Sequence, residues 1–164
     1  MILRAVLFAV AFVLLQLGWQ GLRGTAVERV VVQELTVRSS VLLVNALTPH
    51  VDARADGITV RARGGSLRIE NGCEGMEVWF LLFAAFLVTP LSWKSRCGGF
   101  LLGTVVAFAV NQLRILALFY ANRDDHALFD LLHATVTPIA VILLVAGYFY
   151  VWLNFSARGS AAAA

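Results

Sequence analysis

Three side chains that can take part in covalent or acid–base chemistry lie beside long apolar segments of this sequence. Cys73 stands in GCEG directly before one such segment, Arg114 stands in NQLRI late in another, and His133 opens a third in LLHATVTP. A thiol can act as a nucleophile, and an imidazole can activate it and then protonate the leaving amine. This pairing is typical of covalent acyl transfer.

The residues around Cys73 favour a reactive thiol in some respects and oppose it in others. Gly72 and Gly75 allow close backbone approach, and a position at a helix start lets the terminal N–H groups favour the thiolate or stabilise an oxyanion. Glu74 and Glu77 would oppose thiolate formation if they faced the sulfur.

Arg114 is an ionisable residue inside an apolar segment, where a charge is costly and by default marks a functional site. Asn111, one helical turn earlier on the same face, is positioned to hydrogen-bond a substrate or to orient Arg114. The alternative is that the Arg114 side chain extends to the membrane interface near Tyr120.

A second arrangement of chemical groups competes with the cysteine. His126, Asp130 and His133 in HALFDLLH have i, i+4 and i+7 spacing, so one helix face could hold zinc. That site requires the helix to begin before His126, whereas Asp124 and Asp125 are expected to form its N-terminal cap. We therefore expect no metal site and no cofactor.

The composition indicates a membrane protein. Of the 164 residues 60% are hydrophobic and only 14% are charged, too few to cover a surface that faces water. The net charge of +3 is spread along the chain, which gives no support for nucleic-acid binding. We expect one integral-membrane domain over residues 1–158 and a disordered tail, or a scar of cloning, over residues 159–164.

Four segments are long and apolar enough to cross a bilayer, namely residues 2–20, 76–93, 100–120 and 128–155. A signal peptide is the alternative for the first segment, but its core is long and no small-x-small cleavage site follows, so a retained helix is favoured. Trp19 and other aromatic residues near the segment ends suit the membrane interface. Pro138 is expected to kink the fourth helix.

The segment between the first two spans predicts two smaller elements. Residues 26–47 place Val27, Val31 and Leu35 among charges, which indicates an amphipathic helix on or in the membrane surface. Residues 58–69 alternate apolar and polar side chains around Gly64 and Gly65, which predicts a β-hairpin. The predicted fold is an all-α bundle of about four transmembrane helices with a small amphipathic helix and β-hairpin.

Alternation of four spans places Cys73, Arg114 and His133 at the same membrane surface. Cys97 falls on the opposite side, ~36 Å from Cys73 at helical rise, so no disulfide is expected. A simple count of arginines would place the segment before Cys73 in the cytoplasm, but that segment approaches the length at which the positive-inside rule weakens, so charge does not fix the orientation.

The order and setting of these residues resemble the exosortase/archaeosortase family of membrane transpeptidases, in particular its short members. The resemblance is carried by GCEG with the apolar run after it, by NQLRI and by LLHATVTP. It covers the chain from the amphipathic segment to the fourth predicted span. Relatives commonly have a small residue after the cysteine, where this sequence has Glu74.

The resemblance implies that Cys73, Arg114 and His133 are catalytic and lie at the extracytoplasmic face of the bacterial inner (plasma) membrane. The implied substrates are exported proteins with a C-terminal sorting signal: a short motif, a transmembrane helix and a basic cluster. The Cys73 thiolate would cleave near the motif, and the acyl-enzyme would pass to an acceptor nucleophile. His133 would be acid and base, and Arg114 would hold the thiolate, the substrate carbonyl or the oxyanion.

Around this set, Asn111, Glu74 and Glu77 are expected to bind substrate, and the expected partners are the substrate proteins and membrane lipids. Two other functions are alternatives. One is a metal- or glutamate-dependent intramembrane protease built on Glu74, Glu77 and the His126–His133 face. The other is a non-enzymatic assembly factor whose polar residues join helices.

Overall fold

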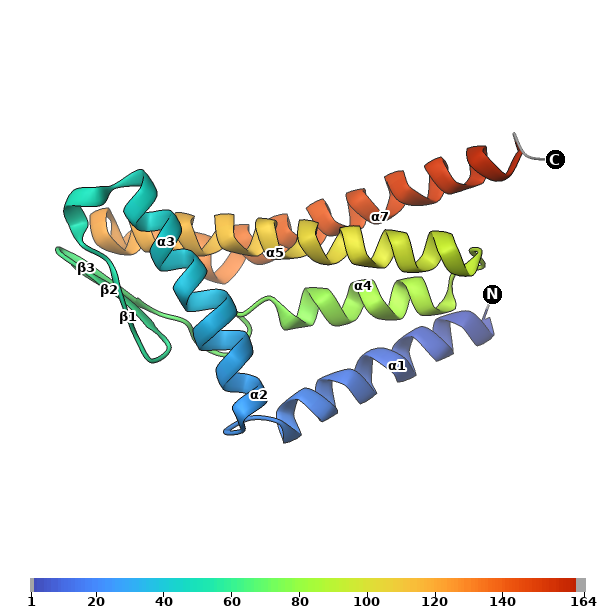
Figure 1. Cartoon of the computed structure of the whole chain (residues 1–164), viewed down its shortest axis with the longest axis horizontal. Helices are drawn as coiled ribbons and strands as arrows, with labels where there is room; N and C mark the ends of the chain where they lie inside the picture. Colours follow the sequence, from blue (N-terminus) through green and yellow to red (C-terminus); the bar gives the residue numbers. More distant parts are fainter. Residues whose placement is uncertain (1, 162–164) are drawn as a thin grey trace.

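The computed structural model describes residues 2–161, which form a bundle of helices with a small sheet at one end (Figure 1). Its long helices are α1 (Ile2–Gly21), α5 (Trp93–Asp124) and α7 (Thr137–Ala161), with the shorter α4 (Met76–Val88) beside α1 and α5. A continuous helical rod crosses the bundle and consists of α2 (Ala26–Arg29), the π-helical η1 (Val30–Val37) and α3 (Arg38–Leu47).

The all-helical membrane fold is confirmed. Within residues 2–161, four helical stretches are long and apolar enough to cross a membrane, and they are Ile2–Gly21, Ala26–Leu47, Trp93–Asp124 and His126–Arg158. These stretches differ from the four predicted spans. Helix α4, within the predicted second span, has only 13 residues, and α5, which contains the predicted third span, has 32.

The division between α4 and α5 follows from local sequence. Pro90 disfavours helical backbone at the residue before it, and Thr89 is extended with φ −78° and ψ 137°. Ser92 then caps α5 by accepting a hydrogen bond from the Ser95 N–H. The third predicted span therefore begins at Trp93 rather than Phe100, and α5 is ~48 Å long at 1.5 Å per residue.

The crossing rod buries Val32, Val37 and Val44 in the core and leaves other apolar side chains exposed. Val27 and Leu35 are exposed, at 47% and 53% of their surface. Thr36 and Ser40 are buried against α5, where the Ser40 hydroxyl donates to Gln112 Oε1 at 2.7 Å. The exposed side also carries the ion pair of Glu34 and Arg38, and this mixture of apolar and charged side chains suits a helix at the membrane interface.

The fourth predicted span consists of α6 (His126–Leu131), the π-helical turn η3 (Leu132–Val136) and α7. Asp125 caps α6 by accepting from the Ala127 and Leu128 N–H groups, as predicted. Pro138 lies at the start of α7, directly after the π-helical turn, and the kink expected there stays a prediction. Helix α7 continues to Ala161, into the predicted tail, and residues 162–164 lie outside the described residues.

The predicted hairpin is present and has a third strand. Strands β2 (Thr59–Ala62) and β3 (Gly65–Arg68) pair antiparallel, and within the described residues β1 (Arg54–Asp56) completes a sheet of order β1-β2-β3. A two-residue turn containing Gly57, at φ 58°, joins β1 to β2. The short 3₁₀ segment η2 (Pro49–Val51) connects α3 to this sheet.

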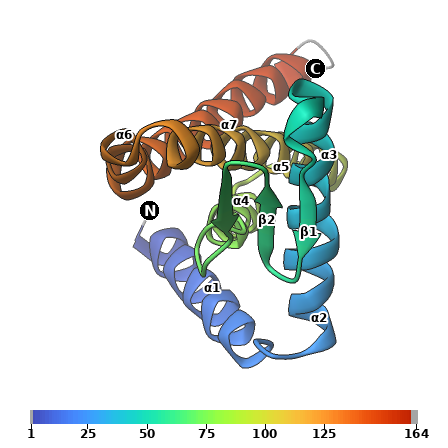
Figure 2. The same ribbon diagram turned by 90° about the vertical axis from the view of Figure 1, so that its left-hand side faces the viewer.

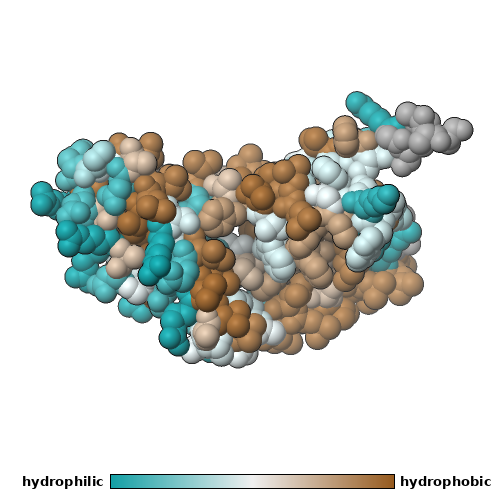
Figure 3. All heavy atoms as spheres, viewed as in Figure 1, coloured by the Kyte–Doolittle hydropathy of each residue, from teal (hydrophilic) through white to brown (hydrophobic). Residues whose placement is uncertain are grey.

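The end of α5 supports the sheet. The Asn122 amide donates to the Ser66 carbonyl at 2.8 Å, and Val60 and Leu67 are buried in the same core as Phe119. Viewed end-on, the sheet stands between α5 and the crossing rod, with α4 behind it (Figure 2). Polar side chains gather over this end, whereas apolar side chains cover much of the helical part (Figure 3).

Candidate active site

The turn that carries Cys73 is shaped by two glycines. The Cys73 N–H donates to the Glu70 carbonyl at 3.0 Å, and Gly72 and Gly75 have φ of 88° and 83°. These left-handed conformations favour glycine. At Gly75 a β-carbon would lie 2.8 Å from Asn111 Cγ, so the turn lies directly against α5.

Arg114 reaches Cys73 and is fully engaged inside the protein. Its Nη2 lies 3.7 Å from Cys73 Sγ, and its Nη1 donates to the Gly72 carbonyl at 3.1 Å. Its Nε donates to Thr137 Oγ1, also at 3.1 Å. The guanidinium therefore joins the Cys73 turn to α7 instead of extending to the interface near Tyr120.

Asn111 supports the same turn from one helical turn away. Its Nδ2 donates to the Cys73 carbonyl at 3.1 Å, and the residue is 3% exposed. Its Oδ1 is buried and, among the residues that the structure describes, has no hydrogen-bond partner. Asn111 thus positions the backbone of Cys73 and keeps one acceptor free.

Cys73 and His133 line one pocket of about 230 Å³, which we call the thiol pocket. The His133 ring stacks on Phe129, with ring centres 5.4 Å apart and planes 9° apart. Its buried Nδ1 has no partner within the described part of the chain. The remaining lining residues come from the sheet end, α5 and α6: Ser66, Leu67, Arg68, Ile69, Glu70, Ile115, Leu118, Asn122 and Phe129.

Glu74 and Glu77 have different surroundings. Glu74 is buried, and its Oε1 accepts from Trp19 Nε1 at 3.1 Å and lies 3.4 Å from Arg23 Nη2. Arg23 also donates to the Asn71 side chain, so it ties α1 to the Cys73 turn. Glu77 is exposed, and its Oε1 would be 3.7 Å from a β-carbon at Gly72. Substrate binding by either glutamate stays a prediction.

Burial dominates the electrostatics of Cys73 and raises the pKa of its thiol above the ordinary value. The charge of Arg114 acts in the opposite direction, whereas the carboxylates of Glu74 and Glu70 raise the pKa further. The free thiol is thus mainly protonated near neutral pH, and a nucleophilic role requires a base close by. His133 lines the same pocket, and its imidazole is the candidate for this base.

The competing metal arrangement receives no support from the geometry. Across residues 2–161, no three His, Cys, Asp or Glu side chains are grouped closely enough to hold a metal ion. Helix α6 begins at His126 itself, and His126 and Asp130 are exposed.

Both cysteines of the described chain are free. Cys97 is partly buried in the first turns of α5, at the end of that helix away from the sheet. It is remote from Arg114 along the helix, by ~26 Å at 1.5 Å per residue. Cys97 therefore provides an internal control for experiments on Cys73.

Residues 1–152 match the family model described as transmembrane exosortase, which covers the site and all of its supporting elements through most of α7. The chain belongs to the transmembrane exosortase family. No curated protein and no solved structure matches it. In this exosortase family member, the resemblance stated from GCEG, NQLRI and LLHATVTP is confirmed at the level of the family.

Four residues that contact the candidate site residues were not predicted from the sequence. Trp19 and Arg23 hold Glu74, Thr137 accepts from Arg114, and Phe129 stacks on His133. The sequence marks Trp19 only as an interfacial aromatic residue. The available signals were weak: a threonine before Pro138, and an aromatic ring one turn before His133.

Proposed function

We propose that this exosortase family member is a membrane-embedded cysteine peptidase and transpeptidase that cleaves the C-terminal sorting signals of exported proteins. The observation that carries the proposal is the 3.7 Å contact between Cys73 Sγ and Arg114 Nη2, with His133 on the same pocket. In this proposal Cys73, in the turn before α4, is the nucleophile, Arg114 of α5 is the cation, and His133 of η3 carries the proton. Family membership supports sorting-signal processing in general.

The proposed reaction has two half-reactions that share one thioester. His133 takes the Cys73 proton, and Sγ attacks the carbonyl carbon of the scissile peptide bond. The tetrahedral intermediate collapses, the C–N bond breaks, and His133 returns the proton to the leaving amine of the membrane anchor. An acceptor nucleophile then gives its proton to His133, attacks the thioester and releases the thiolate.

Arg114 stabilises the negative charges that develop during this reaction. Its Nη2 stabilises the thiolate, and its guanidinium is close enough to contribute to binding of the oxyanion. The hydrogen bonds to Gly72 and Thr137 fix its orientation, so little reorganisation is needed as charge moves. Asn111 holds the Cys73 carbonyl and contributes to substrate binding.

We place this site at the extracytoplasmic face of the bacterial inner membrane, in agreement with the fate of exported substrates. The polar sheet end would then face the outside. Arg114 lies ten residues before Asp124, or ~15 Å along the helix from the end of α5. A substrate anchored by its own helix would present its scissile bond at a fixed depth, which supplies part of the positioning.

The test is processing of a tail-anchored reporter, made of a soluble domain, a candidate sorting signal from the same source and a transmembrane helix. Cys73→Ala should abolish cleavage, and the matched Cys97→Ala variant should cleave at the wild-type rate. Membrane insertion and thermal stability of both variants in detergent confirm that they fold. Cleavage that continues in Cys73→Ala would contradict the cysteine mechanism.

A further inference from the structure

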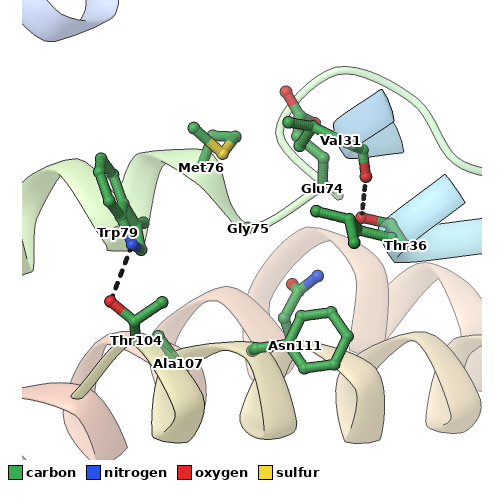
Figure 4. A pocket seen from close by; sticks show the side chains of 11 residues that line it. Val31, Thr36, Glu74, Gly75, Met76, Trp79, Thr104, Ala107 and Asn111 are labelled. Carbon is green, nitrogen blue, oxygen red and sulfur yellow. Dashed lines mark hydrogen bonds between the residues drawn. The ribbon is translucent and has the colours of Figure 1, made fainter. Parts of the chain in front are cut away.

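A second pocket lies beside the Cys73 turn and has a different character. This apolar pocket, of about 260 Å³, is bounded by the crossing rod, the start of α4 and the middle of α5 (Figure 4). Val31, Met76, Trp79 and Phe108 provide most of its apolar wall. The reaction proposed above does not use it.

The two pockets follow one another on the same face of α5. Residues of α5 that line them recur every three or four positions, in the range 104–111 for the apolar pocket and 115–122 for the thiol pocket. The centres of these ranges are ~16 Å apart along the helix. Arg114, which contacts Cys73 Sγ, lies between them.

Asn111, which lines the apolar pocket, carries one buried hydrogen-bond acceptor without a partner among the described residues. Because the Cys73 carbonyl can only accept, Nδ2 of Asn111 must face it, and Oδ1 is left without a partner among the described residues. In Figure 4 the Asn111 side chain points from α5 toward the Gly75 turn.

The other polar groups on the wall of the apolar pocket are already engaged. Trp79 Nε1 donates to Thr104 Oγ1 at 3.0 Å, and the Thr36 hydroxyl donates to the Val31 carbonyl at 2.9 Å. The Glu74 carboxylate accepts from Trp19. The ligand that fits is therefore apolar but carries a hydrogen-bond donor for Asn111.

A peptide meets this requirement better than a lipid chain. Every residue other than proline offers a backbone N–H, whereas an acyl chain offers no donor. An extended peptide covers ~16 Å with about five residues, which matches the spacing of the two pockets. The thiol pocket is lined by Arg68, Glu70 and Asn122, so it suits the polar part of such a segment.

We propose that the apolar pocket binds the first residues of the substrate's membrane anchor, immediately C-terminal to the scissile bond, with a backbone N–H on Asn111 Oδ1. The polar sorting motif, N-terminal to that bond, occupies the thiol pocket. The substrate thus runs along α5 from the thiol pocket, past Cys73 and Arg114, into the apolar pocket. This inference rests on the proposed function and adds the direction of binding and the separate subsites.

The first test narrows the apolar pocket with Ala107→Phe, and Ala117→Phe on an exposed position of α5 is the matched control. Using a reporter that the wild-type chain cleaves, Ala107→Phe should lower kcat/KM roughly tenfold or more. Replacing the apolar residues just after the reporter's cleavage site with residues that have shorter side chains should restore most of the lost kcat/KM. Shorter side chains before the cleavage site should not restore kcat/KM.

Alkylation of Cys73 by iodoacetamide should proceed at the wild-type rate in both variants, which shows that the centre is intact. An equal effect of Ala107→Phe and Ala117→Phe, or rescue only by changes before the cleavage site, would overturn the proposal. Failure of the proposed function itself has a separate signature, because the reporter would then be cleaved by Cys73→Ala.

A second measurement does not depend on a tolerated core substitution. Benzoylphenylalanine replaces Phe108, which is 43% exposed at the apolar pocket, or Ser66 at the thiol pocket, both in the Cys73→Ala background. On illumination, the probe at 108 should cross-link reporter residues after the bond, and the probe at 66 should cross-link residues before it. Cross-links from position 108 to lipid alone, or the reverse order, would overturn the proposal.

Discussion

Cys73 is a thiol whose reactivity depends on opposing neighbours. Burial and the carboxylates of Glu70 and Glu74 raise its pKa, whereas the Arg114 guanidinium at 3.7 Å lowers it. An acid with a raised pKa keeps its proton to higher pH, so the thiolate increases as pH rises through that value. The reactivity of the free enzyme should therefore increase with pH across the neutral and alkaline range.

Removing either charge should shift this pH dependence in a known direction. Arg114→Gln removes the cation, raises the pKa of Cys73 further and should slow iodoacetamide alkylation at pH 8 roughly tenfold. Glu70→Gln removes an anion at an exposed position and should accelerate alkylation. Rates from pH 6 to 10, read by mass spectrometry of the Cys73 peptide, provide the check. Identical profiles for the two variants would show that Arg114 does not control the thiol.

Gly75 is a position where backbone geometry and packing both exclude a side chain. Gly75→Ala combines the strain of φ 83° with a β-carbon 2.8 Å from Asn111 Cγ. Gly24→Ala has the strain of φ 78° with no described atom within 4 Å. We expect Gly24→Ala to cost about 1 kcal/mol of stability without loss of turnover. Gly75→Ala should lower kcat about 10–100-fold by displacing the Cys73 turn. Equal activity of the two variants would contradict this account of Asn111.

At the scale of elements, α5 connects the helical bundle, the candidate site and the sheet. Its first half packs closely against α4 and α7, its middle holds Asn111 and Arg114, and its last turns support the sheet. Gly103 allows the close packing, because a β-carbon there would lie 2.7 Å from Leu82 Cδ2 and from Tyr148 Cε1.

Gly103→Val should therefore destabilise the bundle by about 1–3 kcal/mol through overpacking. Gly147→Val, in α7 with no described atom within 4 Å of its β-carbon, is the matched control and should change stability by less than about 0.5 kcal/mol. Thermal unfolding in detergent micelles measures both. A larger loss in Gly147→Val than in Gly103→Val would show that the α4–α5–α7 packing differs from this description.

The elements also show which features the sequence could predict. Apolar length predicted the helical membrane fold, Gly64 and Gly65 predicted the hairpin, and Asp125 was correctly expected to cap α6. The apolar run of 76–93 hid the break at Pro90, because hydropathy does not sense backbone geometry. Asp56-Gly57 is a local turn signal of the kind that joins β1 to β2.

The candidate site was predictable only in part, for a physical reason. Alternation of the predicted spans places Cys73, Arg114 and His133 at one end of the bundle, and this prediction depends on topology alone. The contacts of Trp19 with Glu74 and of Thr137 with Arg114 join residues 55 and 23 positions apart and depend on packing. No local pattern in one sequence encodes such pairs.

At the scale of the whole molecule, the polar sheet end and the apolar helices divide the protein into an aqueous and a lipid-facing part. The site lies at their boundary, below the sheet and beside the crossing rod. This arrangement suits a substrate that is polar before its scissile bond and apolar after it. The proposed function therefore depends on one covalent event at Cys73.

The most direct test is to trap the acyl-enzyme. The purified chain is mixed with the reporter in detergent, quenched in acid, and analysed by mass spectrometry of the Cys73 and Cys97 peptides. We predict a hydroxylamine-labile adduct on Cys73, with the mass of the reporter up to its cleavage site, and no adduct on Cys97. Efficient cleavage that gives no Cys73 adduct at any time point and persists in Cys73→Ala would contradict the account.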